Sequence, residues 1–333
     1  MTIFRVASFS FGDRQCMLQR MALLAGMVAL LSSCSTVKYV PEGQYLLGQA
    51  KVKAINDDDA INTGQLRSYV RQRPNARWFS LFRLPLATYS LSGRDTTRWI
   101  NRTLRNIGEA PVIFDSMKAV QTCADLTQQL RNEGWLNASV TMATRQHGRK
   151  KLDVTYLLHP GQPYTIGRLT YDIADSIVAT TLAADSRQRL LREGMRFNVS
   201  ALDAERKRIT TLLTDSGYFR FHKEFITYLA DTIAGTRQIA LTLRLSPYRN
   251  SSKADTLHTR YWMRHISYAS GNPQNSHIQL RRHVLSECTH LYEGQPFCSS
   301  GLQDTYNHFG RLQAVKYTNI TLRPVAGTDS LDC

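Results

Sequence analysis

The sequence predicts an α+β protein built as a tandem array of small modules, each in the order strand, helix, helix, strand, strand. Three observations predict it. Amphipathic helical patterns are separated by short runs in which apolar and polar residues alternate. A glycine followed by an aromatic residue closes two of the helical patterns, at Gly134 and Gly217. A Glu-Gly-x-x-Phe motif precedes two predicted helices, at residues 193–197 and 293–297, so the unit recurs along the chain.

The clearest module occupies residues 164–248. Its second helix is predicted at residues 198–216, because leucine and isoleucine recur on one face and Gly217 follows the last turn. Residues 238–245 place a large apolar residue at every second position, which predicts a strand with one face in the core. The other elements are expected, in order, at residues 164–173 (first strand), 186–192 (first helix) and 218–229 (extended segment).

The same order is predicted on both sides of this module. Upstream, a helix is expected at residues 119–133, an extended segment at 137–146 and an alternating strand at 151–158. Downstream, a helix is expected at residues 299–312 and a strand at 314–322. The predicted domains are, in chain order, residues 1–33 (a leader), 34–110 and 111–163 (two modules, the second compact or partly merged with the first), 164–248 (a third module) and 249–333 (a fourth, expected to be truncated in its last strand).

An export leader is predicted at the N-terminus. Residues 21–31 form an apolar run that is too short to span a bilayer comfortably but suits a signal peptide. Arg14 and Arg20 precede this run, and Leu-Ser-Ser-Cys follows it. That tail resembles the lipobox of bacterial lipoproteins. The resemblance implies that Cys34 is the lipid attachment site, carries acyl chains such as palmitate, and becomes the first residue of the mature protein.

The net charge of +16 raises the question of nucleic-acid binding, which the predicted export argues against. Residues 67–105 contain nine arginines, no lysine and one acid, with aromatic and aliphatic residues between them. Close to a lipid anchor, this composition favours contact with an anionic membrane surface. A solvated helix face followed by a packed aromatic loop is the alternative. The residues expected at the membrane are Arg71, Arg73, Arg77, Trp78, Phe79 and Arg83.

The sequence contains no HExxH, GxSxG, P-loop or GxGxxG motif, so we expect no catalytic residue and no cofactor. His283, Cys288, His290 and Cys298 are near one another in the chain. Their spacing matches no compact zinc site, and we expect no metal. In an oxidising compartment, a disulfide between Cys288 and Cys298 and two free thiols both remain open.

The module order, with a Glu-Gly-x-x-Phe loop before the second helix and a Gly-aromatic pair after it, resembles the polypeptide-transport-associated (POTRA) domains of BamA- and TamA-type proteins. Residues 34–47, 71–75, 77–79 and 91–100 are similar to the lipid-anchored, TamA-like branch of Bacteroidetes. The resemblance implies a periplasmic scaffold, not an enzyme, that is lipid-anchored in the outer membrane and takes part in protein assembly or translocation. Too few residues follow the modules for a membrane barrel, so a barrel-less fragment of a longer protein is expected.

Without a predicted reaction, the function is expected to come from binding unfolded outer-membrane proteins or subunits of an assembly complex. A small sheet leaves a strand edge with unpaired N–H and C=O groups, to which another chain can add a strand. In POTRA domains this edge follows the Gly-aromatic turn, which implies residues 218–229, 137–146 or 314–322 here unless neighbouring modules cover them. The alternative is a periplasmic or surface lipoprotein that is an enzyme or a binding protein, for example a glycan-acting enzyme with two carboxylates in a cleft. The residues expected to contact a client are Tyr218, Phe219, Phe221, Lys223 and Phe225.

Overall fold

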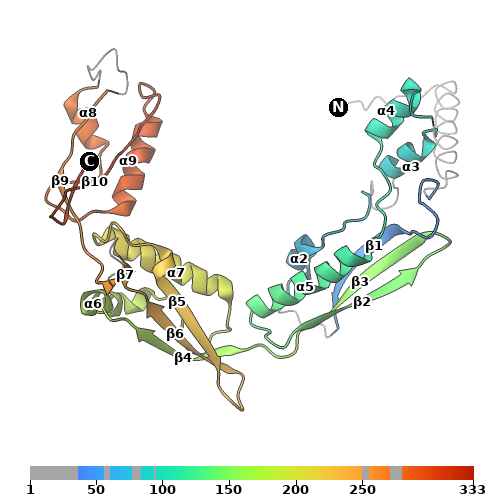
Figure 1. Cartoon of the computed structure of the whole chain (residues 1–333), viewed down its shortest axis with the longest axis horizontal. Coiled ribbons are helices and arrows are strands. Elements are labelled where there is room, and N and C mark those ends of the chain that lie inside the picture. Colours follow the sequence, from blue (N-terminus) through green and yellow to red (C-terminus); the bar gives the residue numbers. More distant parts are fainter. Residues whose placement is uncertain (1–36, 56–60, 77–83, 94, 250–254, 271–279) are drawn as a thin grey trace, which may run out of the picture. The chain divides into compact units, whose positions relative to one another are not determined.

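The computed structural model describes residues 37–55, 61–76, 84–93, 95–249, 255–270 and 280–333. The chain forms two compact units, one of Met1–Arg131 with Asn137–Gly161 and one of Asn132–Leu136 with Gln162–Cys333. The first holds one three-stranded sheet and the second holds two, each accompanied by helices (Figure 1). The predicted α+β class is confirmed. Within the described ranges, no helix is long and apolar enough to cross a membrane.

In the first unit, the strand order is β1-β3-β2, with β1 parallel and β2 antiparallel to the central strand β3 (Figure 1). Apolar residues alternate along β3, and its Val154, Tyr156 and Leu158 are buried. The long helix α5 runs along one face of this sheet. The elements are β1 (Leu46–Ala54), α2 (Thr63–Leu66), η1 (Arg67–Tyr69), α3 (Leu84–Leu91), α4 (Trp99–Ile107), α5 (Ser116–Asn132), β2 (Ser139–Gln146) and β3 (Lys151–His159).

The predicted boundary after residue 110 does not separate two modules. β1 belongs to residues 34–110 and β3 to residues 111–163, yet the two strands pair along their length, with Val52 opposite Tyr156. The two segments therefore contribute strands to one sheet. The helices α2, α3 and α4 are an insertion between the first strand and the long helix. The sequence pattern suggested a separate module because this insertion carries helical patterns of its own.

The first sheet of the second unit has the order β4-β6-β5, and β6 is central, as its buried alternating leucines require. Helix α7 begins after Asn198, whose side chain accepts a hydrogen bond from the Ser200 N–H (2.7 Å). It ends before Gly217, which has a φ of +105°. The elements are β4 (Thr165–Asp172), α6 (Ser176–Ala184), η2 (Ser186–Gln188), α7 (Val199–Asp215), η3 (Lys223–Phe225), β5 (Ile226–Thr232) and β6 (Gln238–Leu245).

Two sequence predictions for this module need correction. The first helix is α6, ahead of the predicted residues 186–192, because the Asp175 carboxylate caps it by accepting the N–H groups of Ile177 (3.0 Å) and Val178 (3.2 Å). The predicted extended segment at residues 218–229 is a strand only from Ile226 onward. Its first part turns instead, since aromatic side chains there are packed in the core rather than alternating across a sheet.

The last sheet has the order β10-β11-β9, with β9 parallel and β10 antiparallel to β11. Its core is a cluster of aromatic and aliphatic residues: Tyr261, Met263, Leu291, Phe297 and Leu331. A short two-stranded ribbon, β7–β8, precedes it. The elements are β7 (Tyr248–Arg249), β8 (Asp255–Thr256), β9 (Trp262–His265), α8 (Arg282–Glu287), α9 (Ser299–Arg311), β10 (Arg323–Pro324) and β11 (Ser330–Asp332).

The predicted strand at residues 314–322 is wrong, and β10 is only two residues long. The Tyr306 hydroxyl, on α9, accepts the Ile320 N–H (3.0 Å) and donates to the Ile320 carbonyl (3.2 Å). A side chain therefore satisfies backbone groups that a neighbouring strand would otherwise bind.

A buried ion network joins α6 to α7. The Glu205 carboxylate is fully buried and accepts hydrogen bonds from the Arg208 guanidinium (2.8 and 2.9 Å) and from the Leu190 N–H (2.9 Å). Arg208 also pairs with Asp185, just after α6. The hydrogen bonds that Arg208 donates to Glu205 and then to Asp185 raise the pKa of Arg208, although burial opposes the shift. Arg208 thus ties the end of α6 to α7, and Glu205 ties the loop that follows η2 to α7.

Replacing this cation tests its structural role. Arg208→Met leaves Glu205 buried without a counter-charge, so the free energy of unfolding of this module should fall by about 3 kcal/mol. Amide hydrogen exchange along α7 measures it. Lys207→Met is the control, since Lys207 pairs with Asp203 on the exposed side of the same helix, and it should leave exchange nearly unchanged. Equal effects of the two substitutions would contradict this account.

Candidate functional site

The outer edge of the first strand in each module is covered by the loop before the long helix. In the β4-β6-β5 module, the Ile166 N–H donates to the Met195 carbonyl (2.9 Å), and the Gly194 N–H donates back to the Ile166 carbonyl (2.7 Å). The Phe197 N–H donates to the Tyr164 carbonyl (2.9 Å). The Glu-Gly-x-x-Phe motif thus acts as a short strand that pairs with the start of β4.

The last module repeats this arrangement. The Met263 N–H donates to the Gln295 carbonyl (2.8 Å), the Gly294 N–H to the Met263 carbonyl (2.7 Å) and the Phe297 N–H to the Tyr261 carbonyl (2.9 Å). The glutamate of each motif adds a bond from its side chain. Glu193 accepts the Leu169 N–H (3.0 Å) and Glu293 accepts the Ile266 N–H (2.7 Å), which the sequence motif alone did not indicate.

The first unit has the same cover without the motif. The Leu47 N–H donates to the Val112 carbonyl (2.8 Å), and the Phe114 N–H donates to the Tyr45 carbonyl (2.8 Å). Leu46 forms an antiparallel bridge with Ile113 between these bonds. The loop geometry therefore recurs in all three sheets, although the Glu-Gly-x-x-Phe pattern is present in only two.

Within the second unit, the Gly-aromatic motif meets the Glu-Gly-x-x-Phe loop. The Gly217 carbonyl accepts the Tyr261 N–H (2.7 Å), so the end of one module bonds to the start of the next. Asp215, the last residue of α7, also accepts the Ser300 N–H (2.8 Å) and hydroxyl (2.6 Å) at the start of α9. At the corresponding Gly134, an added Cβ would lie 2.3 Å from the Phe197 carbonyl oxygen. Glycine is therefore required for this close approach.

The opposite edge of the β4-β6-β5 sheet is formed by β5. It pairs with β6 alone, and the described part of the chain places no strand on its other side. Hydrogen bonds at both ends of β5 show which of its backbone groups face β6. The Ile233 N–H donates to the Gln238 carbonyl (2.9 Å), and the Ser246 N–H donates to the Phe225 carbonyl (2.8 Å). Alternate residues between them therefore point their N–H and C=O groups away from β6.

The outward backbone groups of β5 belong to Ile226, Tyr228, Ala230 and Thr232. The Ile226 N–H is taken by the Lys223 carbonyl. For the N–H groups of the other three, the described residues supply no backbone acceptor. Ala230 and Thr232 are exposed, and Tyr228 is half-buried. These three amides are the free edge of the module.

The other two sheets differ at this edge. β2 lies at the edge of its sheet and pairs with β3 over eight residues, as predicted for residues 137–146. β10 is much shorter, and its ladder pairs Arg323 with Asp332 and Pro324 with Leu331. Since Pro324 has no N–H to donate, that edge is poor for strand addition.

The client-contact residues predicted from the sequence lie just before this edge. Tyr218 and Phe221 are buried in the core, and Phe219 packs against Phe297 (ring centroids 5.2 Å apart). Lys223 and Phe225 form the short helix η3 that precedes β5. None of the five is on the strand. The sequence analysis missed Tyr228, Ala230 and Thr232 because the start of β5 depends on packing. Counting back from the turn at Gly235 indicates that these residues alternate along the strand.

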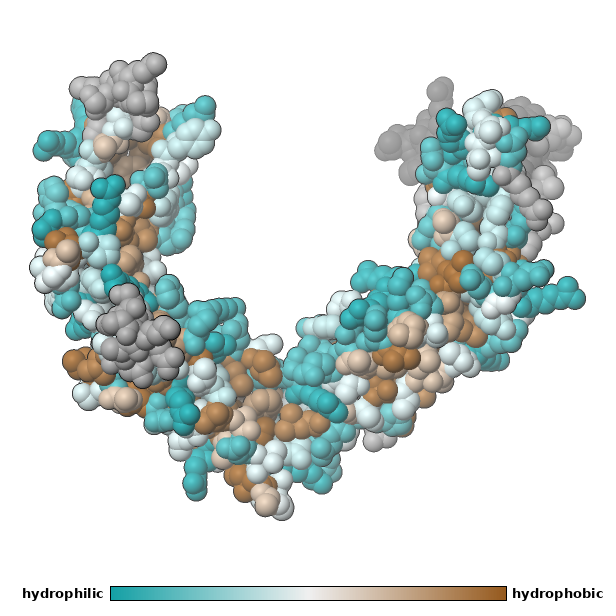
Figure 2. Space-filling view, viewed as in Figure 1, coloured by the Kyte–Doolittle hydropathy of each residue, from teal (hydrophilic) through white to brown (hydrophobic). Residues whose placement is uncertain are grey.

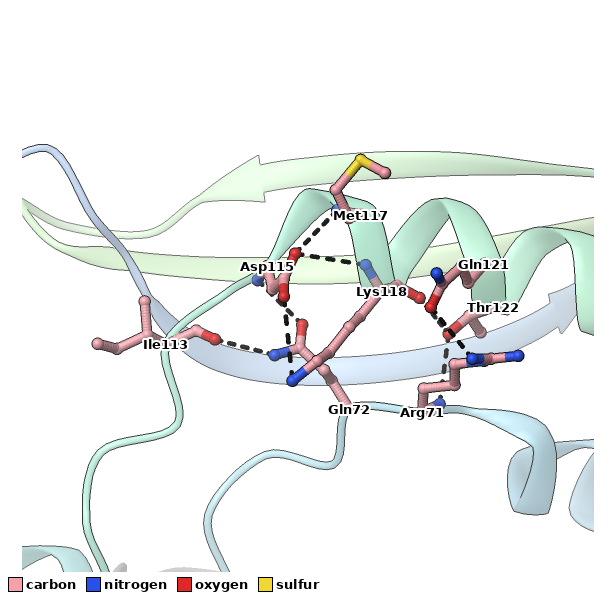
Figure 3. Close-up of polar contacts among 8 residues, drawn as sticks. All are labelled: Arg71, Gln72, Ile113, Asp115, Met117, Lys118, Gln121 and Thr122. Atoms are coloured by element: carbon pink, nitrogen blue, oxygen red, sulfur yellow. Dashed lines mark hydrogen bonds and ion pairs between the residues drawn. The ribbon is translucent and has the colours of Figure 1, made fainter.

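The predicted membrane-contact residues are only partly described. Arg73 is exposed. Arg71 is committed to α5, where it pairs with Asp125 (2.5 Å) and donates to Gln121 (3.1 Å), as Figure 3 shows for its contacts with Gln121 and Thr122. The contact with Asp125 raises the pKa of Arg71. Four of the predicted membrane-contact residues lie outside the described residues, namely Arg77, Trp78, Phe79 and Arg83. Cys34, the predicted lipid attachment site, also lies outside them.

The cysteines of the last module are not bonded to each other. Cys288 and Cys298 are free thiols. Cys298 instead caps α9, where its sulfur accepts the Gly301 N–H (3.4 Å) and its thiol donates to Asp215 (3.5 Å). Burial, with smaller effects from neighbours, raises the pKa of Cys298. The described residues contain no cluster of side chains suited to binding a metal ion.

A pocket of about 220 Å³, lined by both apolar and polar residues, lies in the last module. It is lined by residues such as Leu285, Phe309 and Ile320, and its lining contains no carboxylate. Glycan hydrolysis needs two carboxylates in a cleft, and the side chains that line this pocket supply none.

No protein-family model and no curated protein matches this chain. Solved structures similar to it include POTRA domains 3–5 of BamA from Haemophilus influenzae, with 13% identity and a TM-score of 0.40, covering 88% of this chain and 97% of that one. POTRA domains 1–3 of Omp85 from Anabaena have 11% identity and a TM-score of 0.31, with 88% and 94% covered. At these values the likenesses assign neither family nor function, so the case rests on the chain's own geometry.

An aromatic cluster holds the segment after β8 beside the start of β5. The His258 ring packs against Phe221 (5.0 Å between centroids) and Phe225 (4.8 Å). Its Nε2 donates to the Ser246 carbonyl (3.0 Å). Burial lowers the pKa of His258 from its ordinary 6.5, although the Ser246 carbonyl and the Asp175 carboxylate act in the other direction. Neutral His258 therefore joins the segment after β8 to η3 and to the start of β5.

This burial predicts a pH dependence. Unfolded His258 binds a proton near pH 6.5, whereas the folded chain binds it only at lower pH. The stabilisation is thus fully present above pH 6.5 and is lost as pH falls from there through the folded pKa. Denaturant titrations at about pH 7.5 and about pH 5.5 measure the free energy of unfolding. Its decrease between the two pH values should be smaller for His258→Phe than for the parent. His147→Asn, at an exposed turn, is the control, and an unchanged loss in His258→Phe would refute the prediction.

Proposed function

We propose that this protein is a POTRA-type periplasmic scaffold that binds extended client or partner chains by adding them to the edge of β5, and secondarily of β2. One observation carries the proposal. In each three-stranded sheet, the described chain covers the outer edge at the start of the first strand, whereas β5 and β2 keep an outer edge without a neighbouring strand. An edge of this kind binds another backbone through main-chain hydrogen bonds.

The chemistry of such an edge fits partners that share no sequence. Affinity comes from N–H and C=O groups that every chain has, so it depends little on the side chains of the client. Unfolded outer-membrane proteins and the subunits of their assembly complexes are partners of this kind. The repeated strand, helix, helix, strand, strand order and the recurring loop cover support the POTRA assignment.

We further propose that Cys34 is lipidated and that the protein is held at the outer membrane facing the periplasm. The arginines before the apolar leader and the Leu-Ser-Ser-Cys sequence that follows it support this placement. Two further proposals rest on the same sequence resemblance. These are the TamA-like branch of Bacteroidetes and a role without catalytic residues or cofactors.

Removing one outward amide tests strand addition. Ala230→Pro deletes an N–H that points away from β6, so binding of a peptide with the sequence of an outer-membrane barrel strand should weaken at least about tenfold. The fold should persist because no bond to β6 is lost. Isothermal titration measures binding, and circular dichroism reports the thermal transition.

Ala230→Thr is the matched control, since it keeps the N–H and a residue suited to strands, and it should bind as the parent does. Undiminished peptide binding in a folded Ala230→Pro variant would show that recognition uses another surface.

A further inference from the structure

Helix α4 is amphipathic, but its polar side faces the protein. The Asn101 side chain accepts the Gly93 N–H (2.8 Å) and donates to the Asp95 carbonyl (2.7 Å). Arg105, one turn further on, donates to the Ser92 hydroxyl (3.2 Å) and to the Gly93 carbonyl (2.9 Å). These bonds hold α4 against the end of α3 and the turn that follows it.

The opposite side of α4 is apolar and exposed. Trp99 is 74% exposed, Ile107 is 70% exposed and Ile100 is 52% exposed. Trp99, Thr103 and Ile107 are four residues apart, so they lie on one face, with Ile100 beside it. The face drawn in Figure 2 is mostly hydrophilic, with smaller hydrophobic areas. Folding normally turns the apolar face of a helix inward, so the reversed orientation of α4 leaves this face available to a partner.

The charges around this face identify the class of partner. Arg98 and Arg102 are exposed at the same helix, and α4 itself contains no acidic residue. Asp95 is paired with Arg98 (3.4 Å), and Glu109 accepts the Ala76 N–H (2.9 Å). A short helix with Trp and Ile on one face and arginine around it has the composition of a helix that lies in the interface of an anionic bilayer.

The N-terminal segment places this helix near the proposed anchor. Tyr39 packs edge-on against Tyr89 of α3 (5.6 Å between ring centroids), and the Arg105 guanidinium lies 5.5 Å from the centre of the Tyr39 ring. Lys38 donates to the Ser92 carbonyl (3.2 Å). Cys34 is five residues before Tyr39 in the sequence, and five residues of chain span at most about 18 Å.

We propose that the outward face of α4, formed by Trp99, Ile100, Thr103 and Ile107, inserts into the interface of an anionic lipid bilayer as a second membrane contact. An interfacial helix would hold the protein against the bilayer surface at a second point, in addition to the acyl chains on Cys34. The proposal deepens the membrane placement given above, and its orientation rests on lipidated Cys34. It assigns the contact to α4 rather than to Arg71, which is committed to α5.

The test uses the mature chain from residue 35, exported behind a cleavable leader, so that every described residue is kept and no lipid is attached. Binding to phosphatidylcholine vesicles with and without phosphatidylglycerol is measured by sedimentation. Trp99→Ser combined with Ile107→Ser should weaken binding to the anionic vesicles at least about tenfold. Arg98→Gln combined with Arg102→Gln should weaken binding to the anionic vesicles only.

Met117→Ser combined with Val120→Ser is the matched control. These residues are also exposed and apolar, at 68% and 56%, and they lie on α5 of the same unit. Their replacement should leave vesicle binding unchanged. Equal binding by the α4 variant and the parent would overturn the proposal. So would lipid-independent dimerisation that is lost in the α4 variant, because it would identify a second copy as the partner of this face.

The lipid anchor is tested separately. The full chain and its Cys34→Ala variant are grown with labelled fatty acid, and only the full chain should incorporate the label. Loss of vesicle binding in the α4 variant supports the interfacial helix whether or not Cys34 is labelled. Labelling of Cys34 together with unchanged vesicle binding of the α4 variant keeps the anchor and rejects the helix.

Discussion

The pairing of the first strand with the loop before the long helix is the constraint on which the rest of the fold depends. A three-stranded sheet has two edges, and each exposes unpaired backbone groups. In the second unit, the backbone bonds of Ile166 with Met195 and of Met263 with Gln295 close one edge at its start. The central strands β6 and β11 are paired on both sides. Among the described residues, the opposite edge, formed by β5 in the β4-β6-β5 sheet, has no such loop over its start, which leaves it open to strand addition.

The same loop explains why the modules of the second unit follow one another closely. Tyr261 uses its carbonyl to bind Phe297 of its own module and its N–H to bind Gly217 of the preceding one. In the same way, the Tyr164 carbonyl accepts the Phe197 N–H, and the Tyr164 N–H donates to the Gly134 carbonyl. A sequence motif that closes a sheet edge thus also joins consecutive modules. Gly134 is required because the Phe197 carbonyl oxygen lies too close for a Cβ, and Gly217 is favoured by its φ of +105°.

The sequence predicted best what depends on short-range pattern. The Gly217 stop and the alternation at residues 238–245 are local signals, and the helix α7 and the strand β6 that they predict are confirmed. It failed where tertiary contacts decide. Nothing local indicates that the insertion with α2 to α4 separates two strands of one sheet, or that Tyr306 replaces a strand beside Ile320. The free amides of β5 were missed because buried Tyr218 and Phe221 delay the start of the strand.

Amide hydrogen exchange at β5, with and without a barrel-strand peptide, tests the central claim most directly. The account predicts that the peptide slows exchange at the outward amides of Tyr228, Ala230 and Thr232, because each gains an acceptor. The amides of β6, already paired on both sides, should change little. Peptide binding that leaves the three outward amides unprotected, or that protects only the helices, would contradict the account.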